Sequence, residues 1–360
     1  MIPLRFAATV LFGTIAPFST ANASSTSEKT VLTPDIFAPY LEQFNSEDRE
    51  TYFQAYPNAK ASEFLSKNIP LFECPDKELE QTYYFRWWTY RKHLKETPDG
   101  WVITEFLPAV PWAGKHNTIS CPAAHHIREG RWLKNQRYVA DYLDFWLHKG
   151  GNLRSYSFWI ADSVMAWCDA TGDYAPAKKW LPDLVKNYEA WEKDRLDPAT
   201  GLFWQIDDRD GMEASISGTG FRPSINSYLY GDATAIVRIA EMANNKEVAE
   251  AFGARATKIK ELVQTELWNE EQQFFEVKKG RGDFKAFLTS PERTDLALTN
   301  TRELHGYLPW YFNLPDARFN VAWKQLVDPT GFSAPYGLTS AEQRQRWRAK
   351  RSQFGAFVRW

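Results

Sequence analysis

The chain has 360 residues, of which 44% are hydrophobic and 24% charged, and its formal net charge is −2. This composition is typical of a globular protein with one large domain or two domains. The near-neutral charge argues against a nucleic-acid partner. Aromatic residues are unusually frequent, with 16 Trp, 16 Tyr and 24 Phe. Most of these rings must fill the core, but aromatic faces also stack on sugars, so their number favours carbohydrate handling.

Residues 1–23 have the pattern of an export signal. A cationic start (MIPLR) precedes an apolar run (FAATVLFGTIAPF) and a small-residue cleavage site that ends at Ala23. We therefore expect cleavage after Ala23 and a periplasmic or extracellular protein. No later apolar run is long enough to span a membrane, so we expect no membrane association after cleavage.

Three cysteines would then lie in an oxidising compartment: Cys74, Cys121 and Cys168. An odd number leaves several pairings open. One disulfide with a free thiol, three buried free thiols, and the loss of a fourth cysteine all fit the sequence.

The rest of the chain is predicted to be mostly helical. Residues 24–75 form a lead-in that starts polar and continues with short helical pieces. Apolar residues at helical spacing then predict helices over 76–96, 119–133, 136–149 and 155–171. A loop rich in Pro, aromatic and polar residues, 101–120, interrupts this series and is long enough to be functional.

Two later blocks, 171–205 and 244–277, resemble each other. Each has a polar turn, a long amphipathic helix, a second turn and a short aromatic strand, and each follows a helix rich in small residues. This is an internal repeat of an inner helix, an outer helix and a connecting hairpin. Stacked hairpins of this kind close into an all-α toroid, with short β-hairpins in its loops.

Between the two blocks lies the stretch 204–232, in which four carboxylates fall within seven residues. They are Asp207, Asp208, Asp210 and Glu213. Glycines at 211, 218 and 220 make the stretch a poor helix. One interpretation is a solvent-exposed acidic turn with no catalytic role. The alternative is a rigid loop that delivers carboxylates to a pocket at the mouth of a helical scaffold.

Several motifs between residues 80 and 344 resemble six-hairpin, (α/α)6-barrel glycosidases. The relatives in question are glycoside hydrolase family 63 and the mannosylglycerate-hydrolase-like enzymes, with trehalases more distant. The motifs, in chain order, are YYFRWWTYRKH, FLPAVPWAGKHNTIS, HHIREGRWL, RSYSFW, DGMEASISG, FRPSINSYLYGDA, GYLPWYFNLP and GFSAPYGLTSAEQR. The resemblance implies a six-hairpin domain over 76–344 that cleaves glycosidic bonds.

In that family a Gly-Met-Asp motif carries the general acid, and Glu213 falls on its position. Inverting hydrolysis needs a protonated carboxyl for the leaving oxygen and a second carboxylate, about 6.5–9.5 Å away, to activate water. Neighbouring carboxylates such as Asp208 would help Glu213 to hold its proton. Asp210 is the alternative acid.

The second carboxylate of the family lies in a later Trp-rich Asn-Gly-Pro motif that this sequence lacks. Residues 345–360 are instead basic and contain no acid. We expect the domain to be incomplete at its C-terminus, through truncation or a frameshift, and the base to be lost. If the basic tail is genuine, the base must come from residues 24–343, and Glu303 is the first candidate.

Aromatic and polar residues in these motifs are candidates for sugar binding, although core packing or helix capping would also explain many of them. They are Trp87, Trp112, Lys115, His116, Asn117, Trp159, Trp204, Asp208, Arg222, Asn226, Tyr228 and Trp310. His125 and His126 are adjacent and do not share a helix face, so we expect no metal site. No phosphate-binding Gly loop is present, and we expect no cofactor.

The sequence thus predicts an exported, inverting glycoside hydrolase that acts on a terminal sugar. One rival is a catalytically silent carbohydrate-binding protein, which would bind sugar without turnover. Another is a polysaccharide lyase that uses Tyr228, His116 and Arg222, which would release an unsaturated product that absorbs ultraviolet light. The sugar, the linkage and the oligomeric state stay open.

Overall fold

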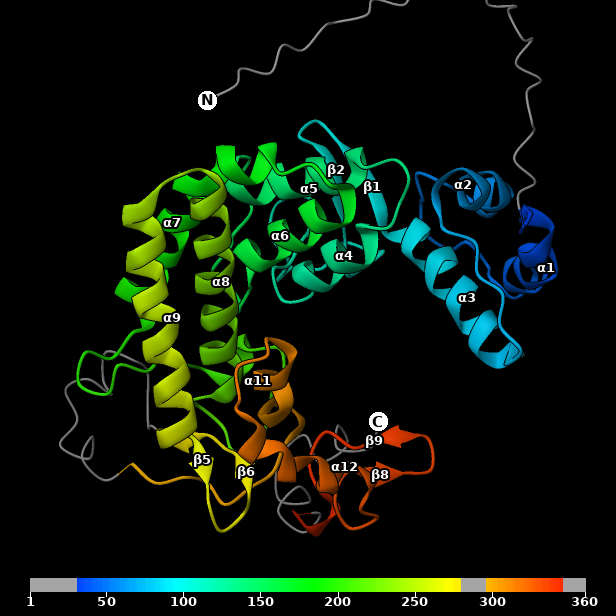
Figure 1. The fold of residues 1–360 in the computed structure, drawn as a ribbon. Helices are drawn as coiled ribbons and strands as arrows, with labels where there is room; N and C mark the ends of the chain where they lie inside the picture. Colours follow the sequence, from blue (N-terminus) through cyan, green and yellow to red (C-terminus); the bar gives the residue numbers. More distant parts are fainter. Residues whose placement is uncertain (1–30, 280–295, 346–360) are drawn as a thin grey trace, which may run out of the picture.

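The computed structural model describes residues 31–279 and 296–345. The expected signal, 1–23, and all but one residue of the basic tail, 345–360, lie outside these residues. The described chain is mostly helical, with small antiparallel hairpins at the ends of the helices (Figure 1). Within it, every helix is too short or too polar to traverse a bilayer.

The longer helices are arranged in three groups along the chain. The first group is α1 (Ala38–Glu47), α2 (Ala61–Asn68) and α3 (Lys77–His93). The second is α4 (Ala123–Gly130), α5 (Arg137–His148) and α6 (Ile160–Thr171). The third is α7 (Ala175–Arg195), α8 (Pro223–Met242) and α9 (Lys246–Glu266), followed by the short α11 (Leu308–Tyr311) and α12 (Lys324–Val327).

Within the described residues, the strands form four small antiparallel sheets. They are β1 (Leu94–Thr97) with β2 (Gly100–Ile103), β5 (Trp268–Asn269) with β6 (Phe274–Phe275), β8 (Ser333–Ala334) with β9 (Gly337–Leu338), and the order β3-β4-β7. In the last sheet, β3 (Trp204–Gln205) pairs with β4 (Gly220–Phe221), and β4 pairs with β7 (Lys278–Lys279). Because β3 and β4 are neighbours, they hold together the two ends of the carboxylate-rich loop.

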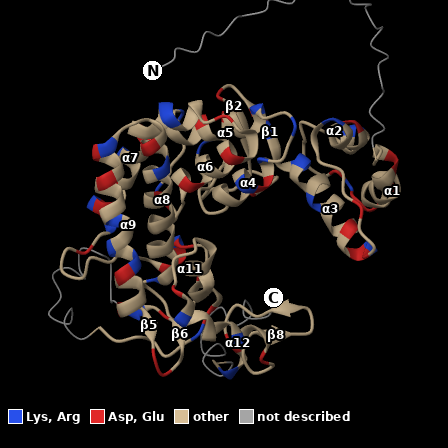
Figure 2. Cartoon of the chain, viewed as in Figure 1, with Lys and Arg blue, Asp and Glu red and all other residues tan. Residues whose placement is uncertain are grey.

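The two predicted repeats correspond to the helix pairs α6–α7 and α8–α9. Gly172, with a φ of 73°, ends α6, and Asn245 caps α9 by accepting from the Val248 amide. Helix α8 is buried along most of its length and packs against α6, α7 and α9. Charged side chains of both signs lie along α7 and α9, as expected for outer helices (Figure 2).

The lead-in packs directly against the rest of the chain. Arg91 of α3 is fully buried and donates to the Tyr56 carbonyl and to the Asn58 side chain. The Tyr56 ring in turn stacks on Trp101 of β2, with centroids 5.6 Å apart. Residues from about 54 onward therefore share a core with the β1–β2 hairpin.

All three cysteines lie in the described part of the chain, and all three thiols are free. Cys168 is buried, whereas Cys74 and Cys121 are half-buried. Of the alternatives that the sequence left open, three buried free thiols comes nearest, but only Cys168 is buried.

Glu276, beside β6, gives the fold a pH-dependent stability. Its carboxyl group is buried, and burial raises its pKa to about 7. One oxygen accepts from Asn269 and from the Asn300 amide, and the other is buried without a hydrogen bond to any described residue. The folded protein therefore keeps a proton that the unfolded chain loses near pH 4.5, so stability falls as the pH rises from about 4.5 to about 7.

We expect Glu276→Gln, which mimics the protonated acid, to be more stable than the parent above pH 7 by about 2–3 kcal/mol. The difference should vanish near pH 4. Thermal unfolding from pH 4 to 8 measures it, with the exposed Glu270→Gln as a control. A constant difference across this range would contradict the assignment.

Candidate active site

The loop between β3 and β4 carries the cluster of carboxylates. It opens with a 3-10 turn, Asp207–Arg209, and then reverses direction at residues with positive φ. These are Gly211 (74°), Ala214 (56°) and Gly218 (69°). Glycine adopts this conformation at little cost, which is why the segment forms a folded loop and not a helix. Glu213 lies within it and is exposed to solvent.

A buried ion pair fixes both ends of this loop. Arg222 Nε donates to Asp210 Oδ2 at 2.6 Å, and both side chains are fully buried. Arg222 Nη1 also donates to the Gly218 carbonyl, at the far end of the loop. Ser157 and Ser224 donate to the two oxygens of Asp210. Both oxygens of Asp210 thus accept hydrogen bonds from buried side chains. This arrangement is typical of a structural carboxylate and not of a catalytic acid.

Glu303 fixes the middle of the same loop. Its two oxygens accept from the amides of Ile216 and Ser217 at 2.8 and 2.9 Å, and the residue is 1% exposed. Burial alone would raise its pKa, but His305 and Ser217 outweigh burial and lower the pKa to about 2. Because this carboxylate is buried and both oxygens accept from backbone amides, it is poorly placed to activate a water molecule. This placement replaces the expectation of Glu303 as the base with a positioning role.

We expect Glu303→Gln to destabilise the fold by about 1–3 kcal/mol, because one backbone amide loses a charged acceptor. Turnover should fall because the loop that carries Glu213 becomes more mobile. The pH optimum of the reaction should stay unchanged. Denaturant unfolding and a pH–rate profile measure the two effects. A pH optimum that moves with little loss of stability would point back to a catalytic Glu303.

Two residues of the segment after β2, Glu105 and Cys121, interact electrostatically with Glu213. Glu105 is exposed at the surface, but partial desolvation by neighbouring protein atoms and, to a lesser extent, the Glu213 charge raise its pKa. Cys121 lies against Gly211, and burial with the charges of Glu213 and Glu105 raises the pKa of its thiol to about 12. Cys121 is therefore a neutral thiol and not a nucleophile. The site contains two neighbouring carboxylates, Glu213 and Glu105.

Sequence patterns did not single out Glu105 or Cys121. The one available signal for Glu105 was its position in the loop 101–120, directly before the motif FLPAVPWAGKHNTIS. Cys121 entered the sequence argument only as a candidate for a disulfide.

An aromatic cluster lies at the base of the carboxylate loop, near Asp210 and Cys121. Trp159 stacks on Tyr228 of α8 at 4.1 Å, and the rings of Tyr311 and Phe312 meet Trp159 edge-on. Tyr228 interacts electrostatically with Asp210 and Cys121, which places it at the base of the loop. Trp159 and Tyr228 are only 2% and 6% exposed. They support the site and offer at most an edge to a ligand.

The loop 106–118 keeps its shape through its own polar residues. Asn117 donates to the carbonyls of Phe106 and Pro108. Lys115 and His116 both bind the Asp99 carboxylate, at 2.5 and 2.6 Å. These three predicted sugar-binding residues therefore already have partners within the protein.

Trp112, in the same loop, is 65% exposed and is the predicted sugar-binding tryptophan most open to solvent. Asp208 is also exposed, on the carboxylate loop itself. Both are accessible to a ligand.

The remaining predicted residues lie inside the protein. Asn226 is buried and bonds both the amide and the carbonyl of Phe203, which joins α8 to β3. Trp204 is fully buried in β3, and Trp87 is buried in α3 against Tyr90. Trp310 is half-buried and packs on Tyr307 and Trp323. Burial excludes direct contact with a sugar for Asn226 and Trp204, so their expected role is replaced by a structural one.

Within residues 31–279 and 296–345, no three His, Cys, Asp or Glu side chains lie close enough together to hold a metal ion.

A family model described as the mannosylglycerate hydrolase MGH1-like glycoside hydrolase domain matches residues 115–351, well over half of the chain. The chain belongs to this MGH1-like glycoside hydrolase family. The match includes the carboxylate loop, the Asp210–Arg222 pair and Glu303, whereas Glu105 lies before it. No curated protein matches the sequence.

Among the solved structures that match this MGH1-like chain are the following two. A structure named "Sialidase" is 43% identical over 87% of the chain, with a TM-score of 0.80. The chain spans 28% of the length of that sialidase. A rhamnosidase of glycoside hydrolase family 78 from Bacillus sp. GL1 is 14% identical over 61% of this chain and 23% of its own, with a TM-score of 0.44.

Proposed function

We propose that this chain is an exported glycoside hydrolase that removes a terminal sugar with inversion, and that Glu213 is the general acid. The observation that carries the proposal is the placement of Glu213. It is an exposed carboxylate on a loop that three buried groups fix from below: Asp210, Arg222 and Glu303. General acid catalysis requires a proton donor that is held in a fixed position beside the bond to be cleaved.

The second carboxylate that inversion needs is proposed to be Glu105. Desolvation and, to a lesser extent, the Glu213 charge raise the pKa of Glu105, so the two carboxylates lie close enough to interact. A raised pKa on one of two neighbouring carboxylates helps to separate the acid and base roles. Glu303 and Asp210 do not compete for this role, because their oxygens are already engaged inside the protein.

The scaffold is proposed to be part of an (α/α)6 toroid. The pairs α6–α7 and α8–α9 have the alternation that such a toroid repeats, with the small-residue helices inside and the amphipathic helices outside. The carboxylate loop and the loop 106–118 would then share one mouth. Trp112 and Asp208 are proposed to contact the sugar there, and Tyr228 and Trp159 to support it.

The experiment that tests the reaction class is the stereochemistry of the first product. Proton NMR during hydrolysis of glycosides of sialic acid, rhamnose, mannose and glucose would show which sugar is released and as which anomer. We expect a free sugar of inverted configuration. Retention of configuration would contradict the mechanism, and an unsaturated product absorbing in the ultraviolet would identify a lyase.

A further inference from the structure

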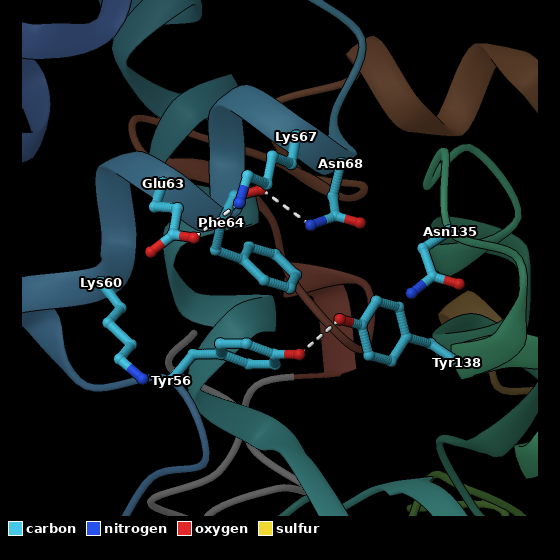
Figure 3. A pocket seen from close by; sticks show the side chains of 8 residues that line it. All are labelled: Tyr56, Lys60, Glu63, Phe64, Lys67, Asn68, Asn135 and Tyr138. Atoms are coloured by element: carbon cyan, nitrogen blue, oxygen red, sulfur yellow. Dashed lines mark hydrogen bonds and ion pairs between the residues drawn. The ribbon is translucent and has the colours of Figure 1, made fainter.

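A cavity of ≈ 380 Å³ lies away from the carboxylate loop, between the lead-in and the start of α5 (Figure 3). Its lining residues are Tyr56, Lys60, Glu63, Phe64, Lys67, Asn68, Asn135 and Tyr138. The volume is within the range of about 300–1,000 Å³ that is usual for small-ligand sites. All but Asn135 and Tyr138 precede residues 115–351, the region that the family model matches.

The two walls of the cavity are fixed to each other. The hydroxyl groups of Tyr56 and Tyr138 are hydrogen-bonded at 2.6 Å, and the Lys134 amide donates to the Asn68 carbonyl at 2.7 Å. The Tyr56 ring also packs on Phe64, with centroids 4.8 Å apart. The cavity is therefore formed before any ligand arrives, which lowers the entropic cost of binding.

One side of the cavity is aromatic and the other is polar. Figure 3 shows the rings of Tyr56, Phe64 and Tyr138 along its floor, with Asn68 and Asn135 above them on opposite walls. The side-chain amide of Asn68 donates to the Phe64 carbonyl, and Asn135 Oδ1 accepts from the Arg137 amide. Asn135 is exposed and keeps further hydrogen-bonding capacity, whereas Asn68 is only 7% exposed and fixes its wall of the cavity. An apolar lining beside an exposed, fixed amide is suited to a sugar ring, which has a C–H face and a rim of hydroxyl groups.

The charge of the lining is positive. Lys67 pairs with Glu63 at 2.6 Å, which compensates both charges. Lys60 makes no ion pair with any other described residue, and it is exposed at the rim. The cavity lining therefore has a net charge of about +1, carried by Lys60, which favours a negatively charged ligand.

We propose that this cavity is a second carbohydrate site, separate from the Glu213 site, which binds one carboxylated sugar unit of the uronate type. Lys60 receives the carboxylate, the exposed Asn135 binds a hydroxyl group, and the edge of the half-buried Tyr56 ring contacts the apolar side of the sugar. Such a site would hold an acidic glycan on the enzyme while the Glu213 site acts on a chain end.

Isothermal titration of the full chain with glucuronate, glucose and acetate at low salt tests the proposal. We expect one molecule of glucuronate to bind, and glucose and acetate to bind at least about tenfold more weakly. Lys60→Ala and Asn135→Asp should each weaken glucuronate binding by about tenfold or more. The second variant keeps the acceptor for the Arg137 amide but adds a negative charge. Lys186→Ala, an exposed lysine of α7, and Glu213→Gln should bind as the parent does.

Four results would overturn the proposal: no binding of glucuronate, equal binding of glucose, equal binding of acetate, or unchanged binding in both cavity variants. Equal binding of acetate would identify a site for any small anion. Binding that Glu213→Gln abolishes and the cavity variants keep would place the ligand at the catalytic loop instead. None of these results bears on the role of Glu213 in hydrolysis.

Discussion

Glu213→Gln is expected to lower turnover of an unactivated glycoside by about 10²–10⁴-fold. The amide has nearly the same shape as the acid but has no proton to give to the leaving oxygen. Because Glu213 is exposed, the substitution should leave the thermal stability within about 0.5 kcal/mol of the parent. The substrate affinity should also change little, so the loss appears in kcat rather than in KM.

The control for this variant is Glu189→Gln, an exposed glutamate on the outer helix α7. It removes the same charge far from the carboxylate loop and should keep the activity of the parent. Glu105→Gln is the complementary variant, because it removes the proposed second carboxylate. If Glu213→Gln retained full turnover, Glu213 would have no part in the reaction.

Arg222→Ala is expected to have the largest effect on stability. It leaves the Asp210 carboxylate buried without its counter-ion, a change that costs about 3–5 kcal/mol. It also removes the bond from Arg222 to the Gly218 carbonyl, so the far end of the loop is released. Turnover should therefore fall in the fraction that stays folded, since Glu213 loses its fixed position.

The matched control is Arg238→Ala. Arg238 also forms an ion pair with an aspartate, Asp169, but both side chains are about half exposed. Surface pairs of this kind contribute at most about 1 kcal/mol. Urea unfolding and single-turnover rates of both variants separate stability from positioning. Equal losses of stability in the two variants would show that burial of the Asp210–Arg222 pair is not what fixes the loop.

The helices were largely predictable from sequence because their signals are local. The pattern over 136–149 predicted α5, which spans Arg137–His148, and the pattern over 76–96 predicted α3, which spans Lys77–His93. The helix expected over 155–171 begins later, at Ile160, because Ser157 is used to bind the loop at Asp210. The repeat of helix pairs was also readable, since turn residues and small-residue faces recur at matching positions.

The roles of the carboxylates were not predictable in the same way. In sequence, Glu213, Asp210 and Glu303 are all plausible catalytic acids. Their roles differ because each contacts different residues in the folded protein. Glu303 meets the Ser217 amide, which is 86 positions away. Asp210 meets Arg222 in a site from which water is excluded. Such long-range contacts depend on the packing of several elements, and no local pattern encodes them.

The most direct test of the account compares Glu213→Gln with the parent on two substrates that share a sugar. One substrate has a poor leaving group, such as an alkyl alcohol, and the other has a good one, such as dinitrophenolate or fluoride. If Glu213 protonates the leaving oxygen, the poor leaving group should lose about 10²–10⁴-fold in kcat and the good one should lose little. Equal losses on the two substrates would contradict a general acid at Glu213.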